Sequence, residues 1–160
     1  MVPCTALLLA CGLAAPCLAA SAGESLCADG EAIVFSCHVG PKMVSLCRPV
    51  EAPQAVVYRY GRAAQVELAA AGGAGPQPTA FWRENAPLIG GGETRVGFER
   101  GSYEYRIYSK VQAKGAQGEP DFEDGVIVLR RGRVVRKMVC DDGGEGFREK
   151  IDWLPPRDGR

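Results

Sequence analysis

The sequence predicts an all-β fold, an antiparallel meander of about eight strands stapled by disulfides. Short runs rich in valine, isoleucine and tyrosine recur along the chain and are typical of strands. The 21 glycines and 11 prolines fall largely between these runs, which favours tight turns over long helices. Regularly spaced short strands either close into a small barrel or stack as a two-sheet sandwich, and the sequence leaves both open.

Residues 1–22 are predicted to be a secretory signal peptide. The segment carries no charged residue, and the apolar run Ala6–Leu18 is followed by small residues. Cleavage is expected before Gly23, with cleavage before Ser21 as the alternative. Met1–Thr5 lacks the basic residues that normally open such a signal, so this region is atypical or the true start lies upstream.

A membrane anchor is the competing interpretation of this segment. Spanning a bilayer takes about 20 apolar residues, and the run is shorter than that. A lipid anchor on Cys11 would leave only a few hydrophobic residues before the cysteine. We therefore expect an exported chain, periplasmic or secreted, with a β domain at 23–140, a C-terminal tail at 141–160 and no transmembrane span.

The seven cysteines divide into two groups. Three lie in the predicted signal: Cys4, Cys11 and Cys17. Four remain in the mature chain: Cys27, Cys37, Cys47 and Cys140. An even number in an exported domain predicts two disulfides, whereas a zinc site would need closely spaced cysteine pairs that are missing here.

Four cysteines allow three pairings, and the sequence alone does not decide between them. If the meander closes on itself, the end of the last strand approaches the start of the first. Cys140 would then bond to Cys27, and Cys37 would bond to Cys47 across the first hairpin. This is the pairing we expect.

The first half of the chain predicts two hairpins. In the first, Gly40-Pro41 separates two β-rich runs. In the second, a loop over Gly61–Ala63 would place Tyr58 opposite Val66, with the apolar residues on one face. The predicted strands are Glu31–Val39, Lys42–Arg48, Gln54–Tyr60 and Ala64–Leu68.

The clearest hairpin is Gly90–Lys110. Apolar and polar residues alternate on both sides of Arg100-Gly101, which predicts a two-residue loop there. Phe98 would then face Tyr103, and Val96 would face Tyr105. All the apolar residues of both strands would fall on one face of the sheet.

A related hairpin is predicted at Gly125–Cys140, around Arg131-Gly132. Its apolar residues fall on both faces near the turn, so we expect it to be covered on both sides or central in a sheet. Three polar or Gly/Pro-rich stretches are predicted as loops or links. They are Ala69–Pro78, Ala86–Gly92 and Val111–Gly125, with a short strand at Thr79–Arg83.

The C-terminal tail holds Gly143-Gly144 and Pro155-Pro156. Between them, Phe147–Leu154 is predicted to form a helical turn that packs Trp153 onto the body of the domain.

No catalytic residue is predicted. His38 is the only histidine and adjoins Cys37 in a predicted strand, where neighbouring side chains point to opposite faces. A Cys–His pair therefore cannot converge, and a serine triad would need the same histidine. With 19 Lys+Arg against 19 Asp+Glu, the chain has no global attraction for nucleic acid. We expect no enzyme activity, cofactor or nucleic-acid partner.

Two acidic runs, Glu119–Asp124 and Asp141–Glu145, offer carboxylates for glycoside hydrolysis or for Ca²⁺. Neither run has the ligand spacing of a calcium loop, and acidic residues in loops are ordinarily solvated. An enzyme would require the two runs to converge in one cleft. We therefore predict no metal site.

The tyrosines could form a stacking platform, but their positions favour a role in the core. Four of the five fall on the predicted apolar faces of their hairpins: Tyr58, Tyr60, Tyr103 and Tyr105. Tyr108 lies on the opposite face.

Several segments together resemble a group of small exported proteins of Gram-negative bacteria that have no assigned function. They are Cys27 with Glu31–Cys37, Met43–Cys47, Tyr58–Gly61, Gly90–Tyr108 and Gly125–Arg130. The resemblance covers nearly the whole mature chain and implies a periplasmic, disulfide-bearing β domain without catalytic residues to assign.

A second resemblance is to periplasmic lysozyme inhibitors, which are small β-barrels that insert Ser/Tyr loops into the cleft of a cationic enzyme. Ser102-Tyr103 at the predicted hairpin turn carries this likeness. The sequence therefore predicts a non-enzymatic exported domain that binds a protein or envelope component or supports the cell envelope. Lysozyme inhibition is the alternative.

Overall fold

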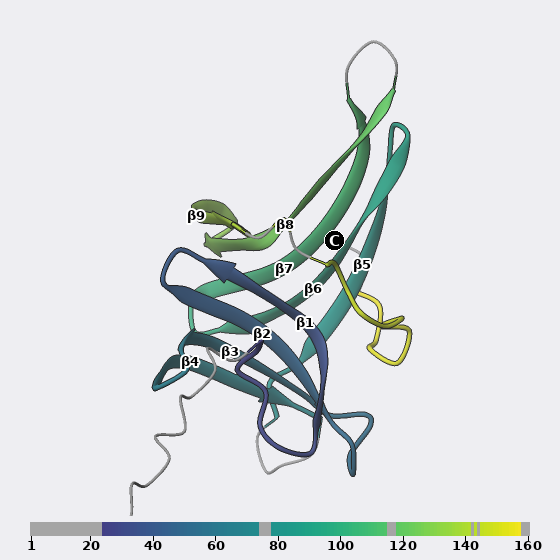
Figure 1. Ribbon diagram of the computed structural model, residues 1–160. Coiled ribbons are helices and arrows are strands. Elements are labelled where there is room, and N and C mark those ends of the chain that lie inside the picture. The colour runs from purple at the N-terminus through teal and green to yellow at the C-terminus, as the bar shows by residue number, and fades with distance from the viewer. Residues whose placement is uncertain (1–23, 74–77, 115–117, 142, 144, 158–160) are drawn as a thin grey trace, which may run out of the picture.

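The computed structural model describes residues 24–73, 78–114, 118–141, 143 and 145–157. These residues form nine antiparallel strands in two sheets, without a helix (Figure 1). The all-β prediction is confirmed, and the two sheets do not close into a barrel. The predicted signal at 1–22 lies outside the described residues. Within them, no helix has the length and apolarity to cross a membrane.

The four-stranded sheet has the order β1-β2-β3-β4. Its first hairpin is as predicted, because Val39 pairs with Lys42 across Gly40-Pro41. Its strands are β1 (Glu31–Val39), β2 (Lys42–Pro49), β3 (Val56–Arg62) and β4 (Gln65–Gly72).

The register predicted between β3 and β4 is wrong. Arg62 pairs with Gln65, and an irregularity at Gly61 shifts the pairing so that Tyr58 faces Ala70 and not Val66. Strand β4 thus includes Ala69–Gly72, which had been predicted as an exposed loop. Small residues are needed there, since a Cβ on Gly72 would lie 2.5 Å from the Phe81 ring.

The five-stranded sheet has the order β5-β6-β7-β8-β9. Its strands are β5 (Phe81–Leu88), β6 (Gly91–Arg100), β7 (Tyr103–Lys114), β8 (Glu119–Arg130) and β9 (Arg133–Val139).

The β6–β7 hairpin forms, but its loop is Gly101-Ser102, one residue beyond the prediction. Phe98 therefore pairs with Tyr105 and not Tyr103, and Val96 pairs with Ile107 and not Tyr105. The shift is two positions along β7, so the apolar residues still share one face. Gly101 has φ +60°, which suits the first central position of a two-residue hairpin turn.

The loop predicted at Val111–Gly125 is largely strand. β7 continues to Lys114 and β8 begins at Glu119, with Val111 paired to Phe122. β5 likewise continues through Ala86–Leu88, in place of the predicted link. Figure 1 shows these ends of β5–β8 projecting beyond the four-stranded sheet. The projecting part has no second sheet against it, so it lacks the apolar alternation that identifies a half-buried strand.

The β8–β9 hairpin turns at Arg131-Gly132, as predicted. The prediction that it is covered on both sides is wrong for β9, because β9 lies at the edge of the sheet and is exposed on both faces. Strand β8 holds the buried residues of this hairpin, since Val126 and Val128 face the core between the two sheets.

The core fills the space between the two sheets. Phe98 lies at its centre, with its ring centroid 5.0 Å from Tyr58, 4.8 Å from Phe81 and 4.9 Å from Tyr105. The prediction that tyrosines belong to the core holds for Tyr58, which is 1% exposed, and in part for Tyr60 and Tyr105. The prediction is wrong for Tyr103, which is 37% exposed.

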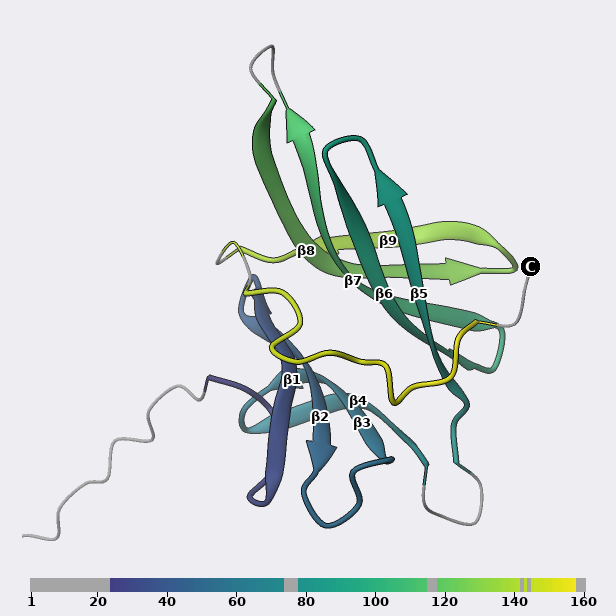
Figure 2. The same ribbon diagram turned by 90° about the vertical axis from the view of Figure 1, so that its right-hand side faces the viewer.

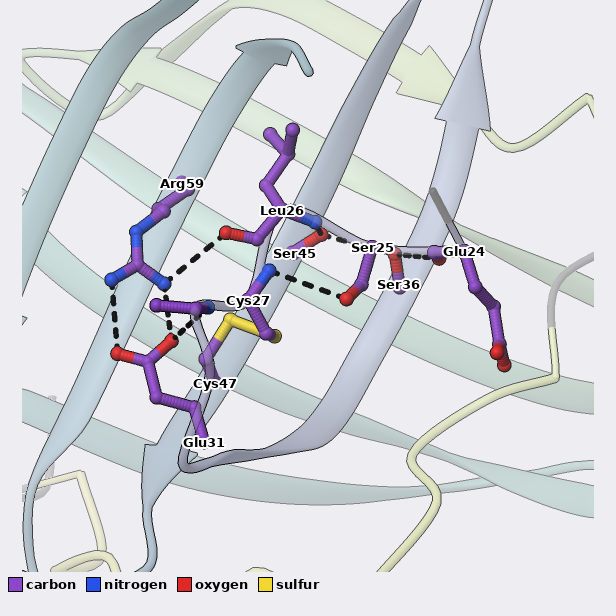
Figure 3. The surroundings of a disulfide bond; sticks show 10 residues. Glu24, Ser25, Leu26, Cys27, Glu31, Ser36, Ser45, Cys47 and Arg59 are labelled. Carbon is purple, nitrogen blue, oxygen red and sulfur yellow. Dashed lines mark hydrogen bonds and ion pairs between the residues drawn. A yellow bond between two sulfur atoms is a disulfide. The ribbon is translucent and has the colours of Figure 1, made fainter. Parts of the chain in front are cut away.

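The disulfides join Cys27 to Cys47 and Cys37 to Cys140, so the expected pairing is wrong. In the β1–β2 register, Cys37 faces Val44 and Cys47 faces Ile33, which separates Cys37 and Cys47 along the hairpin. Cys37 also belongs to the core with Cys140, whereas Cys47 lies beneath the N-terminal segment on the outer face (Figure 3).

Residues 145–157, here called the strap, cross from one sheet to the other (Figure 2). The Arg148 N–H donates to the Val34 carbonyl of β1, and Arg83 of β5 donates to the Pro155 carbonyl. The strap forms no helix, but the Leu154 N–H donates to the Ile151 carbonyl at 3.0 Å, which closes one hydrogen-bonded turn within the predicted segment. Trp153 does pack against the core, together with the buried Leu154.

Candidate functional site

The Cys–His pair considered for His38 does not form. The Cys37 sulfur is bonded to Cys140 and is therefore not available as a thiolate. His38 lies exposed near the end of β1, where its carbonyl accepts a hydrogen bond from Asp141.

Cys27, Glu31 and Cys47 have ligand atoms within 4.8 Å of one another, which is close enough to consider a metal ion. The two sulfurs form a disulfide, however, and a metal would require thiolates. Arg59 holds the Glu31 carboxylate through both of its oxygens, with Nη2 2.9 Å from Oε1 (Figure 3). The hydrogen bond from Arg59 lowers the pKa of Glu31 below its ordinary value.

This disulfide cluster fixes the N-terminal segment onto the four-stranded sheet. The Leu26 N–H donates to Ser45 Oγ at 2.8 Å, and Ser36 Oγ donates to the Glu24 carbonyl at 3.0 Å (Figure 3). Arg59 Nη1 also donates to the Leu26 carbonyl. The buried side chains and completed hydrogen bonds indicate a structural role.

Tyr108, predicted to lie on the face opposite the apolar one, does so but is only 1% exposed. Its hydroxyl donates to Glu123 Oε1 at 2.8 Å, and Lys137 Nζ lies 2.8 Å from the same oxygen. Burial and the Glu123 charge raise the pKa of Tyr108 above its ordinary value. The phenol is thus neutral and enclosed, which leaves it unsuited to contact a ligand.

Burial alone would raise the pKa of Glu123. Hydrogen bonds from Lys137, Tyr108 and Lys110 outweigh burial and lower the pKa to about 2. The carboxylate is therefore ionised at neutral pH and joins β7, β8 and β9 on the outer face of the five-stranded sheet.

A cavity of about 600 Å³ lies between the projecting part of the five-stranded sheet and the strap. We call it the strap groove. Its principal side chains are Thr94, Ser109, Phe122, Asp124, Glu145 and Phe147.

Strand register brings the polar side chains of the strap groove together. Thr94 pairs with Ser109, and Ser109 pairs with Asp124, so the three form a row across β6, β7 and β8. Asp124 Oδ2 accepts a hydrogen bond from the Gly146 N–H at 2.7 Å, which holds the strap over one end of the row. Phe122, two residues from Asp124 in β8, is 68% exposed.

Among the acidic residues that the structure describes, Asp124 and Glu145 are where the two runs come together. Asp124 and Glu145 line the same cavity, but each has a partner, since Arg148 Nη2 lies 2.9 Å from Glu145 Oε2. Asp121 pairs with Lys114, and Asp141 accepts a hydrogen bond from Gly40. The carboxylates of the two runs thus serve separate contacts.

The strap groove combines hydroxyl, carboxylate and aromatic groups from the five-stranded sheet and the strap. Hydroxyls and carboxylates form hydrogen bonds with the hydroxyl groups of a ligand, and aromatic faces cover its apolar C–H surface. This site was not predicted from the sequence, because both acidic runs were assigned to loops. The alternation of Phe122 and Asp124 with Glu123 is the signal that a strand assignment would have used.

Comparison of the chain with models of protein families, with curated proteins and with solved structures finds no match. The lining residues of the strap groove are therefore the basis for inferring its ligand.

Proposed function

We propose that this chain is a non-enzymatic, exported binding domain that holds a glycan in the strap groove. The observation that carries the proposal is the pair of half-buried hydroxyls on Thr94 and Ser109 beside the exposed ring of Phe122. The buried Asp124 holds the strap over the end of the row. Thr94 Oγ1 donates to Asn85 Oδ1 and can still accept a hydrogen bond from a ligand. Hydroxyl-rich ligands suit a row of hydrogen-bonding groups beside an apolar ring, because sugar rings have both kinds of surface.

The surroundings of the strap groove restrict the ligand further. At the cavity, Glu145 is paired with Arg148, and Lys110 is paired with Glu123. The charge that remains is that of the Asp124 carboxylate, which disfavours acidic polysaccharides. Neutral or amino-bearing sugars fit better. The two disulfides support a location in an oxidising compartment, where the periplasm and the cell envelope are the proposed setting.

The test is calorimetric titration of the purified chain with neutral and amino-sugar oligosaccharides, such as cellotriose and chitotriose. We expect weak binding that Phe122→Ala and Ser109→Ala each reduce by about fivefold or more, as expected for the loss of about 1 kcal/mol. Ile89→Ala is the matched control, because Ile89 is 89% exposed and does not line the cavity.

Two results would overturn the proposal. One is the absence of binding to every oligosaccharide tested. The other is release of reducing ends that Asp124→Asn abolishes, because that would make the chain a glycosidase using the carboxylate pair.

Inhibition of a lysozyme remains the second candidate. The observation that favours it is the position of Ser102 in the β6–β7 turn, next to the partly exposed Tyr103. Arg100 and Arg131 lie at the neighbouring strand ends and disfavour a cationic partner. An unchanged rate of bacterial cell lysis at micromolar excess of the chain would exclude it.

A further inference from the structure

The β8–β9 hairpin carries a feature that the strap groove does not use. Its segment Arg130–Lys137, here called the basic hairpin, reads Arg-Arg-Gly-Arg-Val-Val-Arg-Lys. It holds five basic residues and no acidic one, and all of its residues are exposed. The remainder of the chain has 14 Lys+Arg (19 − 5) against 19 Asp+Glu, so the positive charge is concentrated at one place.

Two of the five basic side chains have partners. Lys137 pairs with Glu123, and the Arg130 guanidinium lies 5.4 Å from the centroid of the Tyr103 ring. For Arg131, Arg133 and Arg136, the described part of the chain provides neither an ion pair nor a side-chain hydrogen bond. Three guanidinium groups are therefore available to bind an external anion.

Exposed valines lie among these arginines. Val134 is 61% exposed and Val135 is 54% exposed. Val134 pairs with Leu129 and Arg136 pairs with Val128, so Val135 is an extra residue in β9 and forms a bulge. Figure 2 shows β9 at the edge of the five-stranded sheet. The exposed cationic and apolar residues of the basic hairpin therefore lie together at that edge.

Strand addition by an acidic peptide fits this edge poorly, since bulges and charged side chains are devices that prevent edge pairing. Single-stranded nucleic acid would need exposed aromatic faces, and the nearby Tyr103 ring is covered by Arg130. An anionic lipid surface matches both components of the basic hairpin. Its phosphates bind guanidinium groups, and its headgroup boundary accepts small apolar side chains.

We propose that the basic hairpin docks this domain onto an anionic lipid surface, with Arg131, Arg133 and Arg136 on the phosphates and Val134 and Val135 at the headgroup boundary. Outside the basic hairpin, acidic residues outnumber basic ones, and this part of the chain is repelled by an anionic surface. The basic hairpin therefore also sets the orientation of the domain on the surface. Three arginines near an anionic bilayer are expected to raise the partition coefficient on the order of 100-fold.

The test is co-sedimentation of the full chain with vesicles of equal parts phosphatidylglycerol and phosphatidylcholine, compared with phosphatidylcholine alone. The variant Arg131→Ser/Arg133→Ser/Arg136→Ser should lower partitioning on the order of 100-fold. The matched control, Arg62→Ser/Lys114→Ser/Lys150→Ser, removes the same charge from other exposed positions and should change it by less than about threefold.

A variant with Val134→Ser and Val135→Ser should retain salt-sensitive binding but lose the part that persists in concentrated NaCl, where charge attraction is screened. Circular dichroism establishes that each variant is folded. Oligosaccharide titration of the arginine variant separately measures whether the strap groove still binds its ligand.

Three results with vesicles would each overturn the proposal. They are equal losses of partitioning in the two charge variants, equal binding to neutral and anionic vesicles, and no binding to either. Tighter binding to polyglutamate or to DNA than to vesicles would do so as well.

Discussion

Gly125 leaves room for both the Tyr108 ring and the neighbouring strand. A Cβ at Gly125 would lie 2.2 Å from the Met138 carbonyl oxygen of β9 and 2.9 Å from the Tyr108 hydroxyl, so both contacts require the absence of a side chain. Sequence alternation placed Tyr108 on the polar face correctly. It did not reveal that the residue is buried there, because alternation identifies a face and not what covers it.

The contacts of Glu123 predict a pH dependence. Its pKa in the folded chain, about 2, lies below its ordinary value of 4.5, so the ionised form stabilises the fold. This contribution is complete above the unfolded pKa and is lost as the pH falls from about 4.5 through about 2. Glu123→Gln should lower stability at pH 7 by about 1–2 kcal/mol and flatten its decline in acid.

Urea denaturation measured from pH 7 to pH 2 tests this prediction. Glu119→Gln is the control, because Glu119 is exposed near the start of the same strand and no ion pair of the described chain involves it. Parallel stability curves for Glu123→Gln and the unmodified chain would contradict it.

Among the elements, hairpins with a strong turn signal could be predicted from the sequence. The turns at Gly40-Pro41 and Arg131-Gly132 form where expected. The β3–β4 register could not be predicted, since the irregularity at Gly61 changes the pairing without changing the sequence pattern. The projecting ends of β7 and β8 were missed because neither face is buried against another sheet, which removes the apolar alternation.

The strap is an element whose stability contribution can be measured. Leu154 is 4% exposed and packs into the core between the sheets. Leu154→Ala should lower the free energy of unfolding by about 2–4 kcal/mol through lost burial and the cavity it leaves. Denaturant titration gives the value, and Asp152→Ala, at an exposed position of the same strap, should change it by less than about 0.5 kcal/mol. Similar losses in the two variants would show that the strap does not rely on this burial.

At the scale of the whole molecule, the two disulfides constrain the unfolded chain unequally. Cys37 and Cys140 are 103 residues apart, whereas Cys27 and Cys47 are 20 apart. In the chain-entropy model, replacing Cys37 and Cys140 by alanine should cost about 4–5 kcal/mol and replacing the other pair about 3 kcal/mol.

Denaturant titration of the two double variants measures this difference, and peptide mapping of the non-reduced chain checks the pairing. A Cys27–Cys140 peptide would contradict the structure. Equal costs for the two variants would instead show that native-state contacts at the disulfides outweigh loop length.

Like the β3–β4 register, the candidate site could not be predicted from the sequence. The two acidic runs are evident in the sequence. A joint catalytic role for their carboxylates requires that both runs line one cleft. The sequence could not show that Asp124 and Glu145 line one cavity, because that depends on how the strap crosses the two sheets. Distant contacts of this kind leave no local pattern in the sequence.

The path of the strap also has a consequence for the order in which the chain can fold. Its Arg148 N–H donates to the Val34 carbonyl at the edge of β1, so the first strand of this domain is contacted by residues that follow all nine strands in the chain. Until those residues are synthesised, the Val34 carbonyl lacks this partner and the core residues that Ile151 and Leu154 cover are exposed to water. Folding of such non-local pairings is slow, and a nascent chain that has reached only β9 would need protection from aggregation.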